Sequence, residues 1–304
     1  MSASSSTATR ADVPALAQRE KFGLRKITKA LWRLPFLPVI ILLIVLFSAI
    51  LGPSITPHDP GALDLGNALK PPFWEEGGST ANLLGTDNMG RDILSRIIKG
   101  ANVSVVVAAF AILFSGTIGA LMGMLAGYFG GKIDIIIMRL VDIQMSVPSL
   151  ALALILAAAL RPGMSTVIIV IAVTYWTWYA RIIRGEVLSL KERDFIALAK
   201  VAGCGTFSIL LKHFFPNVVN TLLVLATLQI GSVIIYEASL SFLGLGIQPP
   251  DVSWGLMLSD ARPYISVAWW TITLPGIAIV LTCLGSNLFG DWLRDTLDPK
   301  RRQL

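Results

Sequence analysis

The feature that most constrains this chain is a set of long stretches with almost no Asp, Glu, Lys or Arg. A helix that crosses the hydrocarbon core of a bilayer needs about 20 apolar residues. A soluble domain of this size has no interior large enough to bury so many of them. The composition agrees, because 54% of the residues are hydrophobic, only 14% are charged and the mean hydropathy is +0.71. These values argue against a soluble enzyme, a nucleic-acid-binding protein and a disordered chain.

Six such stretches predict an all-α membrane protein with six transmembrane helices. Their apolar cores are residues 34–52, 101–127, 143–160, 164–181, 217–236 and 267–290. The transmembrane domain is expected to cover 34–290, between an N-terminal arm, 1–33, that is partly disordered, and a tail, 291–304. A long loop, 53–100, follows the first helix, and a charged loop, 182–216, joins the fourth helix to the fifth.

The distribution of Lys and Arg orients these helices, because the two residues concentrate on the cytoplasmic side of a membrane. With both termini in the cytoplasm, 19 of the 25 Lys and Arg residues fall inside and six fall outside. The sequence therefore predicts a multi-pass protein with cytoplasmic termini, an outer loop at 53–100 and a cytoplasmic loop at 182–216. The basic segments are expected to lie beside membrane lipid, which accounts for the net charge of +6 without nucleic acid.

Residue sets for catalysis, metal binding or nucleotide binding are not found in the sequence. Two histidines, His58 and His213, are too few for a His-rich metal site. Two cysteines give no disulfide framework. The nearest string to a phosphate-binding loop, Gly130–Ile133, has the wrong spacing and no hydroxyl. We expect no catalytic residue, no metal and no cofactor.

Small residues recur at every fourth position of the second predicted helix, at Ser115, Gly119, Gly123 and Gly127. This spacing lets two helix backbones approach closely. The favoured interpretation is internal helix packing, and the alternative is a face against a partner subunit.

Four aromatic residues, Tyr175, Trp176, Trp178 and Tyr179, end the fourth predicted helix. Amphipathic rings favour the headgroup level of a membrane, so the pattern predicts an interfacial belt. A stacking platform for substrate is the alternative.

Acidic residues near the predicted spans are candidates for function. Glu237 is close to Ser239 and Ser241, which favours a hydrated position at the outer interface over an ion or proton relay. Asp134 and Asp142 are on either side of Arg139 at helical spacing, which predicts a local charge network.

The cytoplasmic loop is expected to contain two short helices. Asp194 is a candidate N-cap for a helix over 195–202, and Gly203 ends it. A second helix begins near Thr206 and places Phe207, Leu210 and Leu211 on one face, before Pro216 starts the fifth transmembrane helix. A partly apolar helix on a basic loop suits a groove in another protein. The alternative is a helix lying on the lipid surface.

The chain resembles permease subunits of ABC importers of the dipeptide/oligopeptide class over roughly residues 34–300. The first matching string is RDFIALAKVAG at 193–203, which resembles the EAA loop of these permeases and continues to KHFFPN at 212–217. The others are LGTDNMGRD at 84–92, LSFLGLGIQPP at 240–250 and GDWLRDTLDP at 290–299. Where the family usually has Glu-Ala-Ala, this chain has Ala197-Leu198-Ala199, so a salt bridge from position 197 is excluded.

This resemblance implies a transport subunit in the bacterial cytoplasmic (inner) membrane, not an enzyme. Its partners would be a second homologous permease, two cytoplasmic ATPases and an external substrate-binding protein. The residues that would couple it to the ATPases are Asp194, Ala197, Ala199, Gly203, Phe207, Leu210, Leu211 and Pro216.

The cargo stays open between peptides and other solutes such as nickel complexes, opine-like conjugates or sugars. An ion-coupled secondary transporter is the competing function. It would need a buried acid or broken helices at the middle of the membrane, whereas the acids here are near the ends of the predicted helices.

Overall fold

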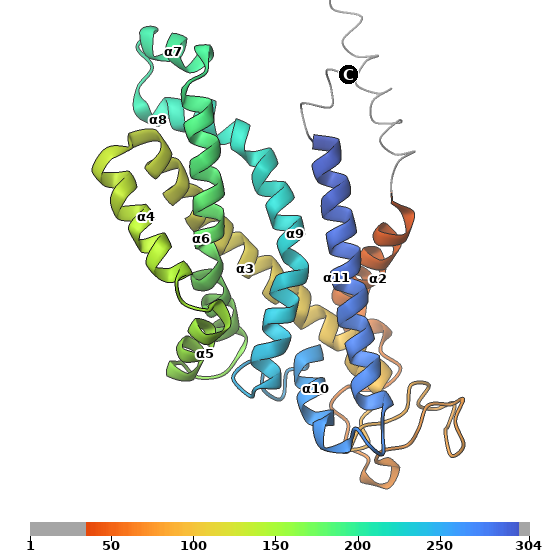
Figure 1. Cartoon of the computed structure of the whole chain (residues 1–304). Helices are drawn as coiled ribbons and strands as arrows, with labels where there is room; N and C mark the ends of the chain where they lie inside the picture. The colour runs from red at the N-terminus through yellow and green to blue at the C-terminus, as the bar shows by residue number, and fades with distance from the viewer. Residues whose placement is uncertain (1–34, 298–304) are drawn as a thin grey trace, which may run out of the picture.

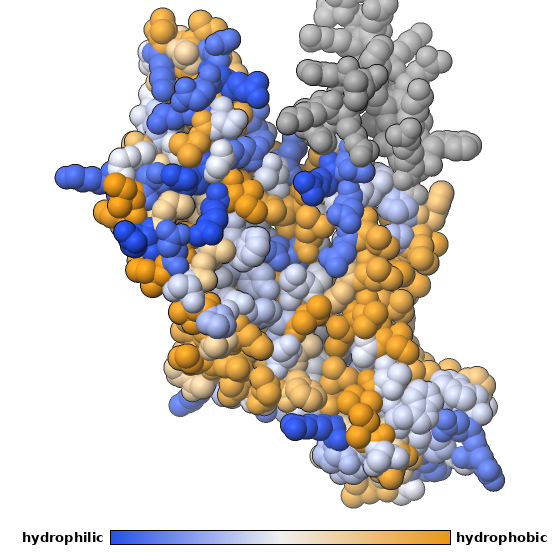
Figure 2. Space-filling model, in the orientation of Figure 1, coloured by the Kyte–Doolittle hydropathy of each residue, from blue (hydrophilic) through white to orange (hydrophobic). Residues whose placement is uncertain are grey.

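The computed structural model describes residues 35–297, and in this part of the chain it consists of helices and connecting loops (Figure 1). The predicted arm 1–33 and the last seven residues of the predicted tail lie outside the described residues. The first and the last described helices pack against each other. Apolar side chains cover the middle of the molecule, while polar ones gather toward both ends (Figure 2).

Four helices are long and apolar enough to cross a membrane. They are α3 (Ile93–Phe129), α6 (Met164–Lys191), α11 (Trp270–Leu297) and a continuous helix that ends in α9 (Phe215–Phe242). The continuous helix begins with α8 (Thr206–Ile209) and passes through a π-helical turn (Leu210–Phe214). Each of the four extends beyond the core predicted from the sequence, because polar residues continue the helix outside the apolar stretch.

The predicted continuous helix over 143–160 is wrong. Here α4 (Gly131–Met145) and α5 (Ser149–Ala159) meet at 90°. Pro148 explains the break, because it has no backbone N–H for the carbonyl of Gln144 and disfavours helical geometry at Val147. Counted together, the bent pair makes a fifth candidate span.

The first predicted span corresponds to α2 (Phe36–Ile55), whose apolar part, Phe36–Gly52, is shorter than those of the other candidates. Helix α2 packs against α3 and α11, where Ile41 is next to Gly285. By length and composition the described chain therefore has four candidate spans, or five with the bent pair, and the count of six stays a prediction.

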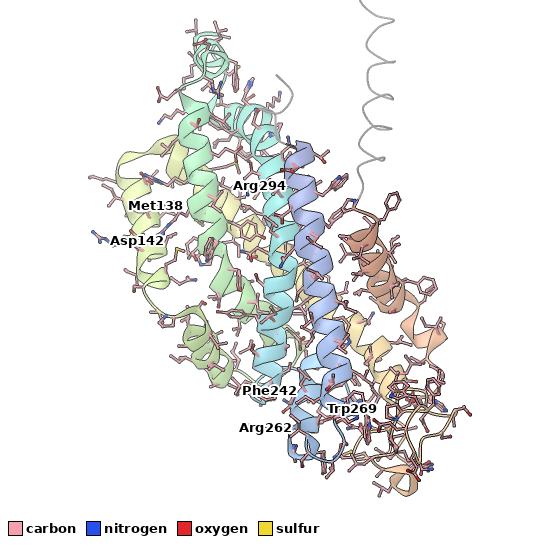
Figure 3. The ribbon with its side chains drawn as sticks, turned by 45° about the vertical axis from the view of Figure 1, so that its right-hand side comes forward. Met138, Asp142, Phe242, Arg262, Trp269 and Arg294 are labelled. Carbon is pink, nitrogen blue, oxygen red and sulfur yellow. The ribbon has the colours of Figure 1, made fainter. Side chains whose placement is uncertain are left out.

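Two short helices mark opposite ends of the bundle (Figure 1). Helix α7 (Asp194–Val201) follows α6, and α10 (Trp254–Ala261) follows α9. We call these the α7 end and the α10 end. The described ends of α2 and α11 both point toward the α7 end, and Figure 3 shows Arg294 there. The segment 56–92, which contains a short 3-10 helix (Leu65–Asn67), lies at the α10 end.

Helices α3 and α6 pack closely along the small-residue stripe, which confirms the predicted internal packing. A Cβ on Gly119 would lie 2.4 Å from the Trp176 carbonyl oxygen, and one on Gly123 would lie 2.6 Å from the Ala180 carbonyl oxygen. Such distances leave no room for a side chain, so glycine is required for this approach.

The aromatic residues predicted as an interfacial belt are instead at the middle of α6, because that helix continues to Lys191. Tyr179 is 2% exposed against α3, and Trp176 donates from Nε1 to Gln144 Oε1 over 3.0 Å. Trp176 and Tyr179 therefore make contacts inside the protein, and an interfacial position for the four rings stays a prediction.

Glu237 is fully buried, so the predicted hydrated position is wrong. Its carboxylate accepts hydrogen bonds from Ser241 Oγ at 2.7 Å and Ser104 Oγ at 3.3 Å. Serines on two helices therefore satisfy the acid inside the protein, a contact that the local sequence did not reveal.

Candidate functional site

A cavity of about 430 Å³ lies between α5, α6 and α9. Its polar lining consists of Ser149, Thr174, Tyr175, Trp178, Gln229 and Ser232. A second cavity, of about 390 Å³, shares Ser149, Thr174 and Trp178 with the first and extends to the bend between α4 and α5. We call the two together the chamber. Pale, weakly polar side chains gather over α6 and α9 on the face of the molecule seen in Figure 2.

The bend between α4 and α5 is fixed to the middle of α6 by one side chain. Gln144 Nε2 donates to the carbonyl oxygens of Val173 at 2.8 Å and Thr174 at 3.0 Å. Its Oε1 accepts from Trp176. This places Ser149, at the start of α5, in the chamber wall.

The chamber has different surroundings toward the two ends of the bundle. On the α10 side, the rings of Tyr175 and Tyr236 meet edge to face with centroids 5.2 Å apart. On the α7 side, the lining is apolar and consists of Ile182, Leu225 and Leu228. The described lining contains hydroxyls, amides and aromatic rings but no charged residue. Such a lining can contact a polar solute during passage without binding it tightly.

The second notable site is the segment 192–211 at the α7 end. One face of α7 is anchored, because Ile196 and Ala199 are buried, and Ile196 joins a small core with Ile183 of α6 and Phe214 of the π turn. The opposite face is apolar and open. On α7, Leu198 is 68% exposed and Val201 87%, and Phe207 at the start of α8 is 75% exposed. An apolar patch on the most polar part of a chain indicates a binding surface.

The turn after α7 depends on Gly203. Its φ of +76° lies in the left-handed region that favours glycine. The Gly203 N–H donates to the Lys200 carbonyl oxygen and the Cys204 N–H to that of Ala199, both over 3.0 Å. These bonds close the end of α7.

The predicted coupling residues are distributed unequally over this segment. Asp194 is the first residue of α7 and makes no capping bond, since the N-cap is Arg193, so the predicted N-cap is wrong by one position. The second predicted short helix is continuous with α9. Among the other predicted residues, Ala197, Gly203, Phe207, Leu211 and Pro216 are exposed, Leu210 is partly buried and Ala199 is buried.

The predicted charge network around α4 exists, but its partners are on α6 and not at Arg139. Asp134 pairs with Arg184 through two contacts of 2.5 and 2.6 Å. Asp142, labelled in Figure 3, pairs with Arg181 at 2.6 Å. Together they hold α4 beside the α7 half of α6.

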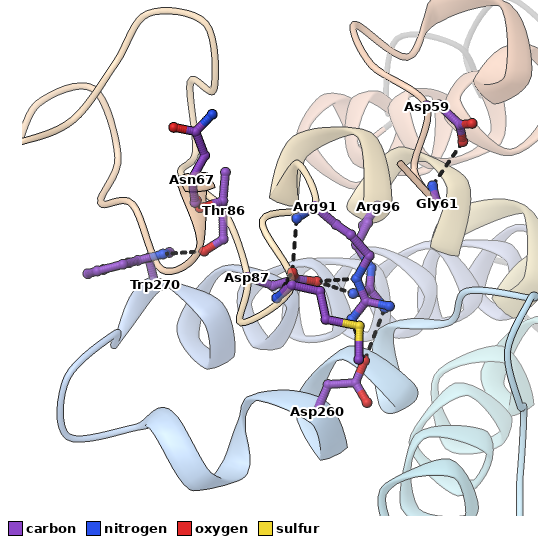
Figure 4. Close-up of polar contacts among 10 residues, drawn as sticks. Asp59, Gly61, Asn67, Thr86, Asp87, Arg91, Arg96, Asp260 and Trp270 are labelled. Atoms are coloured by element: carbon purple, nitrogen blue, oxygen red, sulfur yellow. Dashed lines mark hydrogen bonds and ion pairs between the residues drawn. The ribbon is translucent and has the colours of Figure 1, made fainter. Parts of the chain in front are cut away.

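An ion cluster at the α10 end fastens the segment 56–92 to α10 (Figure 4). Asp87 pairs with Arg91 at 2.6 Å and also with Arg96, and both arginines reach Asp260 of α10, at 3.0 and 3.2 Å. Arg96 is only 1% exposed. Arginines that each bridge two carboxylates define the relative position of distant segments. Nearby, the Arg262 guanidinium lies 5.6 Å from the centre of the Phe242 ring (Figure 3).

The chamber was missed by the sequence reasoning, because its polar residues occur singly within apolar runs. Gln229, Ser232 and Tyr236 do repeat at helical spacing in the fifth predicted span. That repeat was the available signal. The contributions of Ser149 and Thr174 depend on the bend, which the prediction treated as straight helix.

Comparison with known proteins assigns the family. A family model described as "Binding-protein-dependent transport system inner membrane component" matches residues 119–303. The chain is 42% identical over 262 residues to the "Di/tripeptide transport system permease protein DppC" of Pseudomonas aeruginosa, covering 86% of each chain. It is 44% identical over 265 residues to the "Dipeptide transport system permease protein DppC" of Escherichia coli K12, covering 87% of this chain and 88% of the relative.

A solved structure has a similar fold. The inward-facing MetNI methionine ABC transporter includes a chain that aligns with a TM-score of 0.53 and 17% identity, over 66% of this chain and 96% of that one. At this identity the likeness concerns the fold alone.

Proposed function

The chain belongs to the family of binding-protein-dependent transport system inner membrane components, and from this premise we propose that it is the permease subunit through which an ABC importer moves dipeptides. The observation that carries the substrate class is the extent of the likeness to dipeptide permeases, which covers nearly nine-tenths of the chain. The chamber supports it, since a dipeptide is small and polar, and hydroxyl, amide and aromatic groups line a space of about 430 Å³.

In this proposal the chamber is one half of the translocation path. A second, homologous permease would face it and complete the wall. An external binding protein would deliver the peptide, and two cytoplasmic ATPases would supply the energy that the permease has no residues to generate. The segment 56–92 and α10 would face the outside, and α7 the cytoplasm, as the Lys and Arg distribution indicates.

We assign six membrane crossings to the chain in this orientation. Helix α2, the bent pair α4–α5 and the four long helices would each cross once, which places both termini in the cytoplasm. The apolar part of α2, Phe36–Gly52, is short but close to the length of a hydrophobic core.

The exposed apolar face of α7 is the proposed contact with the ATPases. Leu198 and Val201 present it, and Phe207 of α8 is exposed at the same end. Ile196 fixes α7 to α6 and to the π turn from the other side. A push on this face would reach α6 and α9 through packed side chains, and those helices form the chamber wall. Ala197 has no charge, so the contact would depend on packing.

Uptake by the reconstituted complex tests the proposal. Proteoliposomes containing both permeases and both ATPases, supplied with dipeptide-loaded binding protein and internal ATP, should accumulate labelled dialanine. Uptake driven by a proton gradient without ATP, or accumulation of nickel but not of dipeptide, would reject it.

A further inference from the structure

Glu186 of α6 belongs neither to the chamber lining nor to the proposed ATPase contact. It lies four residues beyond Ile182, so it continues the chamber face of α6 toward the α7 end. Its carboxyl group lies near Thr221, which is four residues before Leu225 on the chamber face of α9. The next turn of α6 beyond the apolar end of the chamber therefore carries a carboxyl group.

One oxygen of this carboxyl group has no protein partner. Oε2 of Glu186 is buried and makes no hydrogen bond within the described part of the chain. A buried acceptor without a partner costs about 1–3 kcal/mol, and more when it is charged, so such a group normally has a ligand or a second function.

The charges around Glu186 do not neutralise it. On α6 itself, Arg184 pairs with Asp134 of α4, and Lys191 donates to the carbonyl oxygen of Tyr128 on α3. Helix α5 and residues 215–230 of α9 contain no ionisable residue. On α7, Asp194 and Lys200 are both exposed, and in the π turn Lys212 is exposed and His213 is half-buried. Glu186 thus has a free carboxylate oxygen and forms no ion pair within the described part of the chain.

We propose that Glu186 binds the α-ammonium group of the peptide as the peptide leaves the chamber, and that this contact selects solutes with a free amino terminus. The inference rests on the proposed dipeptide transport. In this contact Oε2 of Glu186 accepts the ammonium hydrogens. A charged hydrogen bond in a partly buried site contributes enough to change a transport rate about ten-fold.

The test measures dialanine transported per ATP hydrolysed in proteoliposomes, at pH 7 and pH 9, with saturating loaded binding protein. The α-amino group titrates near pH 8, so it is mostly charged at the lower pH and mostly neutral at the higher one. The ratio of the wild-type rate to the Glu186→Gln rate removes the pH effects of the binding protein and the ATPases, which both complexes share. This ratio should be about ten at pH 7 and approach one at pH 9.

Two further variants separate the contact from a purely structural role. Thr221→Val removes the neighbouring hydroxyl and keeps the carboxylate, so transport and its pH dependence should persist. Glu186→Asp keeps the charge on a shorter side chain and should give an intermediate rate with the same dependence, which decides the matter if Glu186→Gln does not assemble. Asp291→Asn, which removes an exposed charge at the end of α11, is the control and should match wild type.

Each other outcome overturns the inference. A ratio near one at pH 7 means that Glu186 does not contact the peptide. An equal loss at both pH values, or the same loss in Thr221→Val, means that Glu186 only joins α6 to α9 or to a neighbouring subunit. If the wild-type complex moves no dialanine, the proposed function is rejected, and the inference that rests on it is rejected as well.

Discussion

Arg184 of α6 donates two parallel hydrogen bonds to Asp134 of α4, from Nε to Oδ1 at 2.5 Å and from Nη2 to Oδ2 at 2.6 Å. The two residues are 50 positions apart in sequence, and their side chains are 31% and 19% exposed. A fork of this kind fixes both distance and orientation, which a lysine could not do. It makes α4 and the α7 half of α6 one unit.

Arg184→Gln should therefore lower the free energy of unfolding by about 1 kcal/mol, which corresponds to a few degrees in Tm. Thermal unfolding of the detergent-solubilised complex measures this. The pair Arg181–Asp142 is the control, because its side chains are 50% and 59% exposed and Arg181→Gln should change stability by less than about 0.5 kcal/mol. Equal effects of the two variants would contradict the structural role given to Arg184.

Gly119→Ala tests the close approach of α3 to α6. The new methyl would lie 2.4 Å from the Trp176 carbonyl oxygen, so the helices must separate, at a cost of about 1–3 kcal/mol. Gly116→Ala is the matched control, since its nearest neighbour would be a ring carbon of Tyr179 at an ordinary 3.7 Å. The yield of monodisperse complex and its Tm should fall for the first variant and hold for the second. The reverse order would mean that the helices pack differently.

Gly203→Val tests the turn after α7. Valine in the left-handed region strains the backbone by about 1–3 kcal/mol, yet no atom lies within 4 Å of the added Cβ, so the bundle should stay folded. We expect α7 to shift and loaded binding protein to stimulate ATP hydrolysis much less. Gly203→Asn, which tolerates this φ, should retain most of the stimulation. Normal stimulation in the valine variant would remove the turn from the coupling mechanism.

Leu198→Ser tests the exposed face of α7 as the ATPase contact. The variant loses apolar area at a docking surface but no internal packing, so the permease should remain stable while ATPase subunits co-purify several-fold less well. Leu65→Ser is the control, because Leu65 is similarly exposed, at 74%, but lies in the segment at the α10 end. If both variants retain the ATPases equally well, the docking face is elsewhere.

The long apolar runs allowed the sequence to predict the all-helical class and the position of most helices. It could not predict the bend at Pro148 within a run that is uniformly apolar on both sides. The aromatic residues of α6 illustrate a second limit, because an apolar stretch ends where polarity changes, while the helix continues to Lys191. The composition therefore predicts which residues are apolar enough for the membrane, but it does not predict where the helix ends.

The candidate sites divide in the same way. The segment around Gly203 was predictable because its residues are consecutive and its glycine has a local conformational role. The chamber was not, since Ser149, Thr174 and Gln229 meet only after three helices have packed. The buried position of Glu237 depends on Ser104, 133 residues away, and the Asp87 cluster depends on Asp260 in the same manner.

The π turn at Leu210–Phe214 interrupts the regular α-helical hydrogen bonding of the 37-residue helix Thr206–Phe242 close to its α7 end. Pro216, two residues after the turn, has no backbone N–H, so the helix lacks one main-chain hydrogen bond at that point. Bending is easier there than in the regular turns of α9 on the far side. A displacement of α7 would consequently reach α9 through the one part of this helix that bends most easily.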